Sequence, residues 1–310
     1  MNDHNKKSVL LVGASGMAGQ AFTKYLKSNN LKVIGLSRRG PDIFADFRDN
    51  NKNIIEQILT INPEIIINCA AIVSIAYCEE NPEEAYKINS LLPKTLASIC
   101  SLIGSRLIHI STDHYYYGDG KALHSEEDSI NLRNKYAETK YKGELNALKY
   151  EKSLVLRTNI TGFRGDKSSP TFIEWLIDSL LYRKQLKLFY DFYTSTIDVE
   201  SFCKICMDST LIKTTGVLNI AASFSTSKKE FAYKLSETMG IDLNWAEDSS
   251  ITSLETERAD SLGLDCSKAE AILTRKMPSP DEVIRNLVIQ SRLKNNFKLK
   301  RSDCDRILFR

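Results

Sequence analysis

The stretch that decides the fold is Val9-Leu-Leu-Val-Gly13-Ala-Ser15-Gly16-Met17-Ala-Gly19, where a short apolar run meets three glycines spaced three apart. The apolar run is typical of a buried strand, and the segment 16–28 that follows has a helical period. Glycines at such a turn let the backbone approach a pyrophosphate, and a helix N-terminus offers free N–H groups. The spacing differs from the common G-x-G-x-x-G, so a glycine-rich turn without a ligand is the alternative. We favour dinucleotide binding, with Gly13, Ser15, Gly16, Met17 and Gly19 beside the cofactor.

Short apolar runs and helical segments alternate through the first half of the chain. The further runs are Lys32–Leu36, Glu64–Asn68, Leu107–Ile110 and Leu154–Leu156, and the helical segments between them are 51–61, 82–103 and 132–150. Strand, helix and strand at this spacing indicate βαβ units on a parallel sheet. We therefore expect an α/β fold with a Rossmann-type doubly wound parallel sheet.

The pattern changes after residue 160. Gly162–Pro170 is polar and rich in turn residues, and helices are expected over 172–182, 197–207, 228–239 and 280–292. These features predict a smaller C-terminal α/β lobe. The expected domains are 1–160 for the dinucleotide, 161–293 for the smaller lobe and 294–310 as a basic tail. A later strand and helix are expected to return to the first domain.

Composition excludes several classes of protein. The 310 residues are 42% hydrophobic and 26% charged, which is ordinary for a globular chain and excludes collagen, coiled coil and a largely disordered protein. No apolar run reaches 18 residues, and the first residues lack a signal-peptide core, so we expect no stable membrane insertion. The net charge of the chain is +3, and residues 292–310 alone carry a charge of +5. The rest of the chain therefore has a net charge of −2, which predicts no nucleic-acid binding.

Seven cysteines are scattered along the chain, and several lie in apolar runs. This usage favours a reducing, cytoplasmic compartment and mostly buried thiols. Cys203-x-x-Cys206 lies on an apolar helical pattern without a second pair, so we interpret it as part of the core and expect no metal site.

The second predicted strand ends at Leu36-Ser-Arg38-Arg39. An NAD site usually has an acidic residue here to bind the ribose 2′-hydroxyl, whereas arginines suit a 2′-phosphate. Two solvated arginines are the alternative. We favour NADP over NAD, with Arg38 and Arg39 at the phosphate.

Tyr136 and Lys140 are four residues apart and share one face of the expected helix. A tyrosine has a pKa of about 10, and a neighbouring ammonium would lower it. Such a pair can donate a proton to a carbonyl that receives a hydride. An exposed helix face is the alternative. Ser111-Thr112-Asp113 ends an upstream strand, where ligands bind in open α/β sheets, although helix caps would also explain it.

Further motifs follow the glycine loop in a consistent order. They are Ala45-Asp46-Phe47, Pro63-Glu-Ile-Ile-Ile-Asn68-Cys69-Ala70-Ala71, Glu79-Glu-Asn-Pro82-Glu-Glu-Ala-Tyr86-Lys-Ile-Asn89, Ser111-Thr112-Asp113, Tyr136 with Lys140, Leu156-Arg-Thr158, Gly216-Val-Leu-Asn-Ile-Ala-Ala222 and Leu264-Asp-Cys-Ser-Lys268. Together they resemble the extended short-chain dehydrogenase/reductase superfamily, and within it the dTDP-4-dehydrorhamnose reductase (RmlD-like) family, from about residue 8 to 290.

The resemblance implies an NADPH-dependent oxidoreductase that reduces the 4-keto group of a nucleotide-diphosphate 4-keto-6-deoxy sugar, in bacterial surface polysaccharide biosynthesis. It also implies that 1–160 is an NADP-binding Rossmann domain and that the smaller C-terminal α/β lobe, 161–293, is mainly a substrate-binding lobe. NADPH is expected over NADH. Tyr136, Lys140, Thr112 and Asp113 are the expected catalytic residues. Asp46, Phe47, Cys69, Ala70, Ala71 and Asn89, with Tyr136 and Lys140, are implied at the cofactor; Thr112, Arg164, Tyr193 and Arg258 are implied at the nucleotide-sugar substrate.

The sequence also departs from the family pattern. His114 follows Ser-Thr-Asp where a Tyr is usual, Cys69 replaces an Ala, and Arg258-Ala stands for Arg-Pro. Asp191-Phe-Tyr193-Thr lacks the usual core of the substrate lobe. Family dehydratases carry a Glu at the position of His114, which argues against dehydration.

Two alternatives to reduction stay open. One is a nucleotide-sugar epimerase of the same superfamily, and the other is a non-catalytic NADP-binding regulatory protein. The family often forms dimers, so a homodimer is also open.

Overall fold

A parallel sheet organises the computed structural model, which describes residues 8–40, 42–48 and 52–293. Its order is β12-β7-β5-β4-β1-β2-β3, and every pairing is parallel. The strands are β1 (Ser8–Val12), β2 (Lys32–Ser37), β3 (Ile43–Phe44), β4 (Ile65–Asn68), β5 (Arg106–Ile110), β7 (Ser153–Arg157) and β12 (Gly216–Asn219). The predicted Rossmann-type sheet is confirmed. The predicted basic tail at 294–310 lies outside the described residues.

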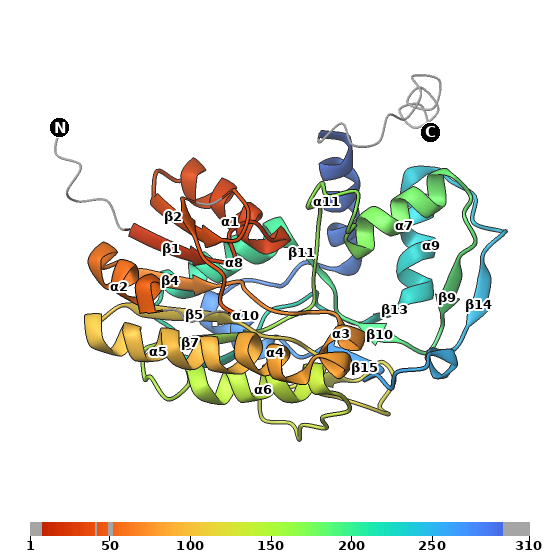
Figure 1. Ribbon diagram of the computed structural model, residues 1–310. Coiled ribbons are helices and arrows are strands. Elements are labelled where there is room, and N and C mark those ends of the chain that lie inside the picture. The colour runs from red at the N-terminus through yellow and green to blue at the C-terminus, as the bar shows by residue number, and fades with distance from the viewer. Residues whose placement is uncertain (1–7, 41, 49–51, 294–310) are drawn as a thin grey trace.

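Helices cover both faces of this sheet (Figure 1). They are α1 (Met17–Ser28), α2 (Lys52–Ile61), α3 (Ile75–Glu80), α4 (Pro82–Tyr86), α5 (Leu92–Ile103), α6 (Lys135–Ala147) and α8 (Val199–Leu211). Along β1, Val9 and Leu11 belong to the core with α1 and α8, while Leu10 and Val12 belong to the core with α2 and α5. Burial on both faces explains why the strands are continuous apolar runs.

A second group of short strands and helices forms the lobe that carries α7 and α9 (Figure 1). Its small sheet has the order β13-β10-β15-β6, and two strand pairs, β11-β8 and β14-β9, lie apart from it. The elements are β6 (Leu123–His124), β8 (Ile160–Thr161), α7 (Phe172–Leu181), β9 (Lys187–Phe189), β10 (Tyr193–Thr194), β11 (Ile197–Asp198), β13 (Thr226–Ser227), α9 (Lys228–Met239), β14 (Glu247–Ser249), η3 (Ile251–Ser253), β15 (Ser261–Leu264) and α11 (Pro280–Leu293). Helix α10 (Ser267–Leu273) instead contacts α8 and β12 at the large sheet.

Several elements cross between the halves of the sequence, and α8, which covers the large sheet, is one of them. Strand β12 pairs with β7 in the large sheet, although it comes after residue 160. Strand β6 comes before residue 160 but pairs with β15 of the small sheet. The helix expected over 197–207 begins at Val199, because Ile197 and Asp198 form β11 and Asp198 caps the helix at Ser201.

A buried ion pair joins α6 to the end of β7. The guanidinium of Arg157 donates to the Glu144 carboxylate at 3.0 Å, and both side chains are almost fully buried. Ser111, just after β5, also donates to Glu144, at 2.5 Å. Arg157 further donates to the Tyr116 hydroxyl and to the Glu126 carbonyl. The pair therefore fixes the helix of Tyr136 and Lys140 against two strands of the sheet.

We expect Glu144→Gln to lower the free energy of unfolding by about 3–5 kcal/mol, because it leaves the Arg157 charge buried without a counter-charge. Urea unfolding followed by tryptophan fluorescence measures the change. Asp281→Asn removes one partner of a half-exposed ion pair with Lys234 and serves as the control, with an expected loss below about 1 kcal/mol. Equal losses in the two variants would contradict the prediction.

Candidate functional site

The glycine loop after β1 has no room for side chains at Gly13 and Gly19. Gly13 has φ +84°, and a Cβ there would lie 2.8 Å from the backbone nitrogen of Ala70. A Cβ on Gly19 would overlap the carbonyl oxygen of Gly13. Gly16 precedes α1 and has no side chain to cap it, and the first turn of α1 holds no acidic residue. The loop thus presents backbone N–H groups and the positive end of a helix, which suits an anion.

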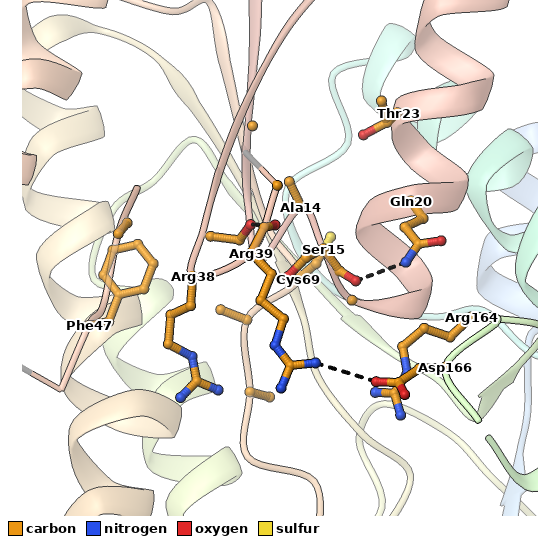
Figure 2. A pocket seen from close by; sticks show the side chains of 18 of the residues that line it. Ala14, Ser15, Gln20, Thr23, Arg38, Arg39, Phe47, Cys69, Arg164 and Asp166 are labelled. Carbon is orange, nitrogen blue, oxygen red and sulfur yellow. Dashed lines mark hydrogen bonds and ion pairs between the residues drawn. The ribbon is translucent and has the colours of Figure 1, made fainter. Parts of the chain in front are cut away.

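An open cleft of about 1020 Å³ begins at this loop. Figure 2 shows its walls, which come from the ends of β1, β2 and β4 and from a segment after β8. Of the residues predicted at the cofactor, the cleft is lined by Gly13, Ser15, Gly16, Arg38, Arg39, Asp46, Phe47, Cys69, Ala70 and Ala71. Met17 and Gly19 lie in the first turn of α1, whereas Asn89, Tyr136 and Lys140 are buried beyond the cleft lining.

Arg38 and Arg39 lie exposed on one wall of the cleft (Figure 2). Arg39 Nη1 reaches Asp166 Oδ2 at 3.4 Å across the opening. The Asp46 carboxylate accepts from Arg48 Nε at 2.9 Å, and these hydrogen bonds lower the pKa of Asp46 to about 2. Asp46 is therefore a carboxylate at neutral pH and is held by Arg48, a residue that the sequence interpretation missed.

Arg164 lies on the wall of the cofactor cleft, whereas we expected it at the substrate. It belongs to a loop that follows β8 and precedes α7, together with Asp166, Ser168 and Ser169. The sequence marks this loop as turn-rich, but the local pattern gives no sign that it packs beside the glycine loop. The placement depends on contacts between distant parts of the chain: a Cβ on Gly162, just before this loop, would lie 3.5 Å from Met17 Sδ at the start of α1.

The end of β4 is held by buried amides. Asn68 Oδ1 accepts from the backbone nitrogen of Ala70, and Asn68 Nδ2 lies 3.1 Å from His109 Nδ1. Asn89 accepts from the Ile72 nitrogen at 2.9 Å and donates to the Ile72 carbonyl at 3.0 Å. Its amide is thus engaged by the loop of Ala70 and Ala71, so the observed contacts give Asn89 a role in shaping the cleft wall.

Asn89 lies in a π-helical turn, η2 (Lys87–Leu91), between α4 and α5. The turn packs against α6 at Gly143, where a Cβ would overlap the Asn89 carbonyl oxygen. Asn89 Nδ2 also donates to the Thr139 hydroxyl, and the Ser90 hydroxyl donates to the Thr139 carbonyl. Turns of this kind often occur at functional sites. Here the turn connects the wall of the cleft to the helix of Tyr136.

Tyr136 and Lys140 share the buried face of α6, as their spacing predicts. The helix begins after Asn134, whose side chain accepts from the nitrogen of Ala137 at 2.9 Å. Lys140 Nζ donates to the Ile110 carbonyl at 2.7 Å, at the end of β5. Burial lowers the pKa of Lys140 to about 8, and the charge of Glu144 opposes that shift.

The pKa of Tyr136 is raised, and our expectation that Lys140 lowers it was wrong. Burial is the main cause, and the charge of Asp113 adds to it. A hydrogen bond with the Thr112 hydroxyl opposes the shift. The reason for the error is that Lys140 points to the Ile110 carbonyl, while the tyrosine hydroxyl faces the residues after β5. A raised pKa keeps the phenol protonated, which is the form that donates a proton.

Asp113 is buried and joins a chain of hydrogen bonds that reaches the second lobe. Asn159 Nδ2 donates to Asp113 Oδ2 at 2.7 Å, and Asn159 Oδ1 accepts from the Thr196 hydroxyl at 2.9 Å. Thr196 lies 2.8 Å from the Thr194 hydroxyl, which accepts from Lys228 Nζ at 3.3 Å. The chain therefore runs from an ammonium to a carboxyl group.

Charge and burial oppose each other at both ends of this chain. Burial raises the pKa of Asp113 to about 7, and the hydrogen bond from Asn159 and the charge of Lys228 oppose that shift. Burial lowers the pKa of Lys228 to about 8, and the charge of Asp113 opposes it. The ammonium also lies 4.6 Å from the ring centre of Phe172. Sequence reasoning missed Lys228, Asn159 and Thr196, because each is an ordinary polar residue in its own segment.

His114, Arg258 and Tyr193 lie on the side of the second lobe. The His114 ring packs edge-on against Tyr136, with ring centres 5.5 Å apart. Burial lowers the pKa of His114 to about 3, helped by the charges of Lys228 and Arg258. Within the described residues, no hydrogen bond or ion pair is found for the Arg258 guanidinium, and its Nε is buried. Tyr193 lies on β10, and Lys121 Nζ is 5.7 Å from its ring centre.

The described cysteines lie in the core or on the wall of the cleft. Cys203 and Cys206 are fully buried in the core, as expected. Cys69 is partly covered and lines the cleft, and burial raises its pKa to about 12.

Across residues 8–40, 42–48 and 52–293, no helix combines the length and apolar character needed to span a bilayer, and no His, Cys, Asp and Glu cluster suited to a metal ion is found.

Comparison with known proteins supports one family. The model of the RmlD substrate binding domain matches residues 7–292. A probable low-salt glycan biosynthesis reductase of Haloferax volcanii is 25% identical over 284 residues, which cover 88% of this chain and 94% of that protein. The methionine adenosyltransferase 2 subunit beta of Bos taurus is also 25% identical, over 278 residues that cover 86% and 82% of the two chains.

Solved structures confirm the fold. A dTDP-4-dehydrorhamnose reductase of Bacillus anthracis, solved in complex with NADP, superposes with a TM-score of 0.84 at 22% identity. The superposition covers 92% of this chain and 99% of that one. The resemblance inferred from the sequence motifs is therefore confirmed at the level of family and fold.

The raised pKa of Asp113 predicts that ionising this carboxyl group lowers the free energy of unfolding as the pH rises, an effect that Asp113→Asn removes. The folded-state pKa of about 7 exceeds the unfolded value of about 4, so the unfolded state releases this proton first as the pH rises. The stability of the wild type relative to the variant should therefore fall from about pH 4 to pH 7 and then level off. Urea unfolding of both proteins across this range measures it. A difference that is constant with pH would contradict the prediction.

Proposed function

We propose that this chain, which belongs to the RmlD substrate-binding-domain family, is an NADPH-dependent reductase of a keto group on a nucleotide-diphosphate sugar. The observation that carries the proposal is the buried group of Tyr136, Thr112 and Lys140 at the ends of α6 and β5, next to a cleft shaped for a dinucleotide. A structural role for the tyrosine alone would not require a buried lysine on the same face of α6 or a threonine hydroxyl at the tyrosine oxygen.

The cleft fits NADP on the features of this chain. The glycine loop leaves room only for backbone at Gly13 and Gly19, and the first turn of α1 has neither a capping side chain nor an acidic residue. Gly13, Ser15, Gly16, Met17 and Gly19 would hold the pyrophosphate at this helix end. Arg38 and Arg39 would bind a 2′-phosphate, since guanidinium groups match phosphate geometry. Cys69, Ala70 and Ala71, shaped by Asn89, would line the nicotinamide side, and Asp46 and Phe47 the adenine side.

When bound, NADPH supplies the hydride. Tyr136 would donate its proton to the carbonyl oxygen; its raised pKa keeps the phenol protonated but makes it a weaker acid than a free tyrosine. Lys140 uses one of its N–H donors on the Ile110 carbonyl and has two others for a ribose hydroxyl. In the structure the Thr112 hydroxyl donates to Asp113 Oδ1 at 3.4 Å, and Asn159 fixes that carboxyl group. When substrate binds, Thr112 would turn this hydrogen to the reacting oxygen and so hold it next to Tyr136.

The substrate is proposed more finely from the family resemblance. We take it to be a nucleotide-diphosphate 4-keto-6-deoxy sugar, reduced in the cytoplasm for bacterial surface polysaccharide. Arg258 has a half-buried guanidinium without a partner among the described residues, which suits a sugar hydroxyl or a phosphate oxygen. Tyr193 would lie beside it on β10. The position of Arg164 on the cofactor cleft makes that residue a weaker choice for substrate.

The main alternative is a non-catalytic NADP-binding protein. The similarity to a methionine adenosyltransferase subunit over most of the chain favours it. The intact Tyr136, Lys140 and Thr112 favour the reductase. An epimerase would use the same residues but would retain its cofactor through the reaction.

Tyr136→Phe separates these functions. We expect the variant to lose at least about 100-fold in turnover, because general acid catalysis contributes about 10²–10⁴-fold. NADPH consumption with a panel of nucleotide 4-keto-6-deoxy sugars measures the rate. NADPH binding should be retained, since the phenyl ring still fills the buried position.

Two outcomes would contradict the reductase. Equal turnover in Tyr136→Phe would remove Tyr136 from the chemistry. Tight NADPH binding by the wild type with no turnover of any sugar in the panel would favour the non-catalytic alternative. Lys142→Met, on the exposed side of the same helix, is the matched control and should leave turnover unchanged.

A further inference from the structure

A loop from the second half of the chain forms part of the cofactor cleft. We call residues 164–169 the strap. Its residues Arg164, Gly165, Asp166, Ser168 and Ser169 line the same cleft as the glycine loop and Arg39 (Figure 2). The strap follows β8 and leads into α7, which is a helix of the second lobe. A cofactor bound in the cleft would therefore contact a segment that belongs to the substrate-binding side.

One buried carboxylate anchors the start of the strap and the N-cap residue of α7 that follows it. Glu174, in the first turn of α7, accepts from the nitrogens of Arg164 at 2.8 Å and Gly165 at 2.6 Å. Its other oxygen accepts from the nitrogen of Thr171 at 2.8 Å, in a capping box. Gly165 has φ +81°, which a side chain would strain. The strap is therefore a closed turn built on α7, with its middle facing Arg39.

Asp166 lies in the middle of the strap and divides its two oxygens. Oδ1 accepts from the Ser168 nitrogen at 3.0 Å and from the Ser168 hydroxyl at 2.6 Å. Oδ2 faces Arg39 Nη1 at 3.4 Å. The Asp166 side chain is 28% exposed, whereas Arg39 is 82% exposed. The hydrogen bonds from Ser168 lower the pKa of Asp166, so it is a carboxylate at neutral pH.

We propose that Asp166 competes with the 2′-phosphate of the cofactor for Arg39, and so sets how strongly the chain prefers NADPH over NADH. This inference rests on the cofactor of the proposed function. A phosphate monoester carries nearly two negative charges and three acceptor oxygens, so it displaces a single carboxylate from an exposed arginine. The carboxylate nevertheless reduces the affinity for NADPH, because its ion pair with Arg39 must be broken. NADH has no 2′-phosphate, so it binds without breaking this pair.

Asp166→Asn tests the competition with little change of shape. The asparagine keeps an oxygen for Ser168 and loses the charge that faces Arg39. Titration of protein fluorescence with NADPH and with NADH gives both dissociation constants without any sugar substrate. We expect NADPH to bind about two- to fivefold more tightly and NADH binding to be unchanged, the size expected for an exposed ion pair. The gain should shrink at 1 M salt.

Two further variants make the test specific. In an Arg39→Met background, Asp166→Asn should give no gain, because the shared partner is absent. Glu200→Gln is the matched control, since Glu200 pairs with Lys24, another cation that lines the cleft. It should leave the ratio of the NADPH and NADH dissociation constants as in the wild type.

Several results would overturn the proposal. Weaker NADPH binding in Asp166→Asn would mean that Asp166 holds Arg39 ready for the phosphate. Equal shifts for NADPH and NADH, or a full gain in the Arg39→Met background, would assign the effect to the shape or the general charge of the strap. Unchanged NADPH binding in Asp166→Asn would overturn this inference alone. A wild-type protein that binds neither nucleotide would overturn the proposed function as well.

Discussion

The buried pair of Glu144 and Arg157 is the interaction on which the geometry of the candidate site depends. Glu144 lies one helical turn after Lys140 and accepts from both Arg157 and Ser111. Removing two charges from water is costly, and the cost is offset here because each oxygen of the carboxylate has donors. The result is directional: α6, the end of β5 and the end of β7 meet at fixed positions. Tyr136, Thr112 and Asp113 lie on those same three elements or next to them.

The parts of the fold that could be predicted are those that local patterns determine. Five of the seven strands of the large sheet, β1, β2, β4, β5 and β7, follow from apolar runs, because a parallel sheet buried on both faces requires such runs. The glycine loop follows from the need for backbone contact at Gly13 and Gly19. Tyr136 and Lys140 share a face because four residues make about one helical turn.

The parts that could not be predicted depend on contacts between distant segments. Arg164 looks like a substrate-lobe residue in the sequence, but its loop lies beside the start of α1, where Gly162 packs close to Met17, and Arg164 lines the cofactor cleft. The raised pKa of Tyr136 depends on how deeply α6 is buried and on where Lys140 points. The π-helical turn at Asn89 has no local signal, since its extra residue is explained by the close packing at Gly143.

The order of residues between Lys228 and Asp113 has a consequence for proton movement. Thr196 must give its hydroxyl hydrogen to Asn159 Oδ1, so Thr194 must donate to Thr196 and Lys228 to Thr194. Each hydrogen bond of the chain therefore has a fixed donor and a fixed acceptor. The amide of Asn159 exchanges protons poorly, and it separates the hydroxyl groups from the carboxyl group. The chain can therefore transmit charge and orientation between the lobes but does not conduct protons, and a proton lost by Tyr136 must return by a route other than this chain.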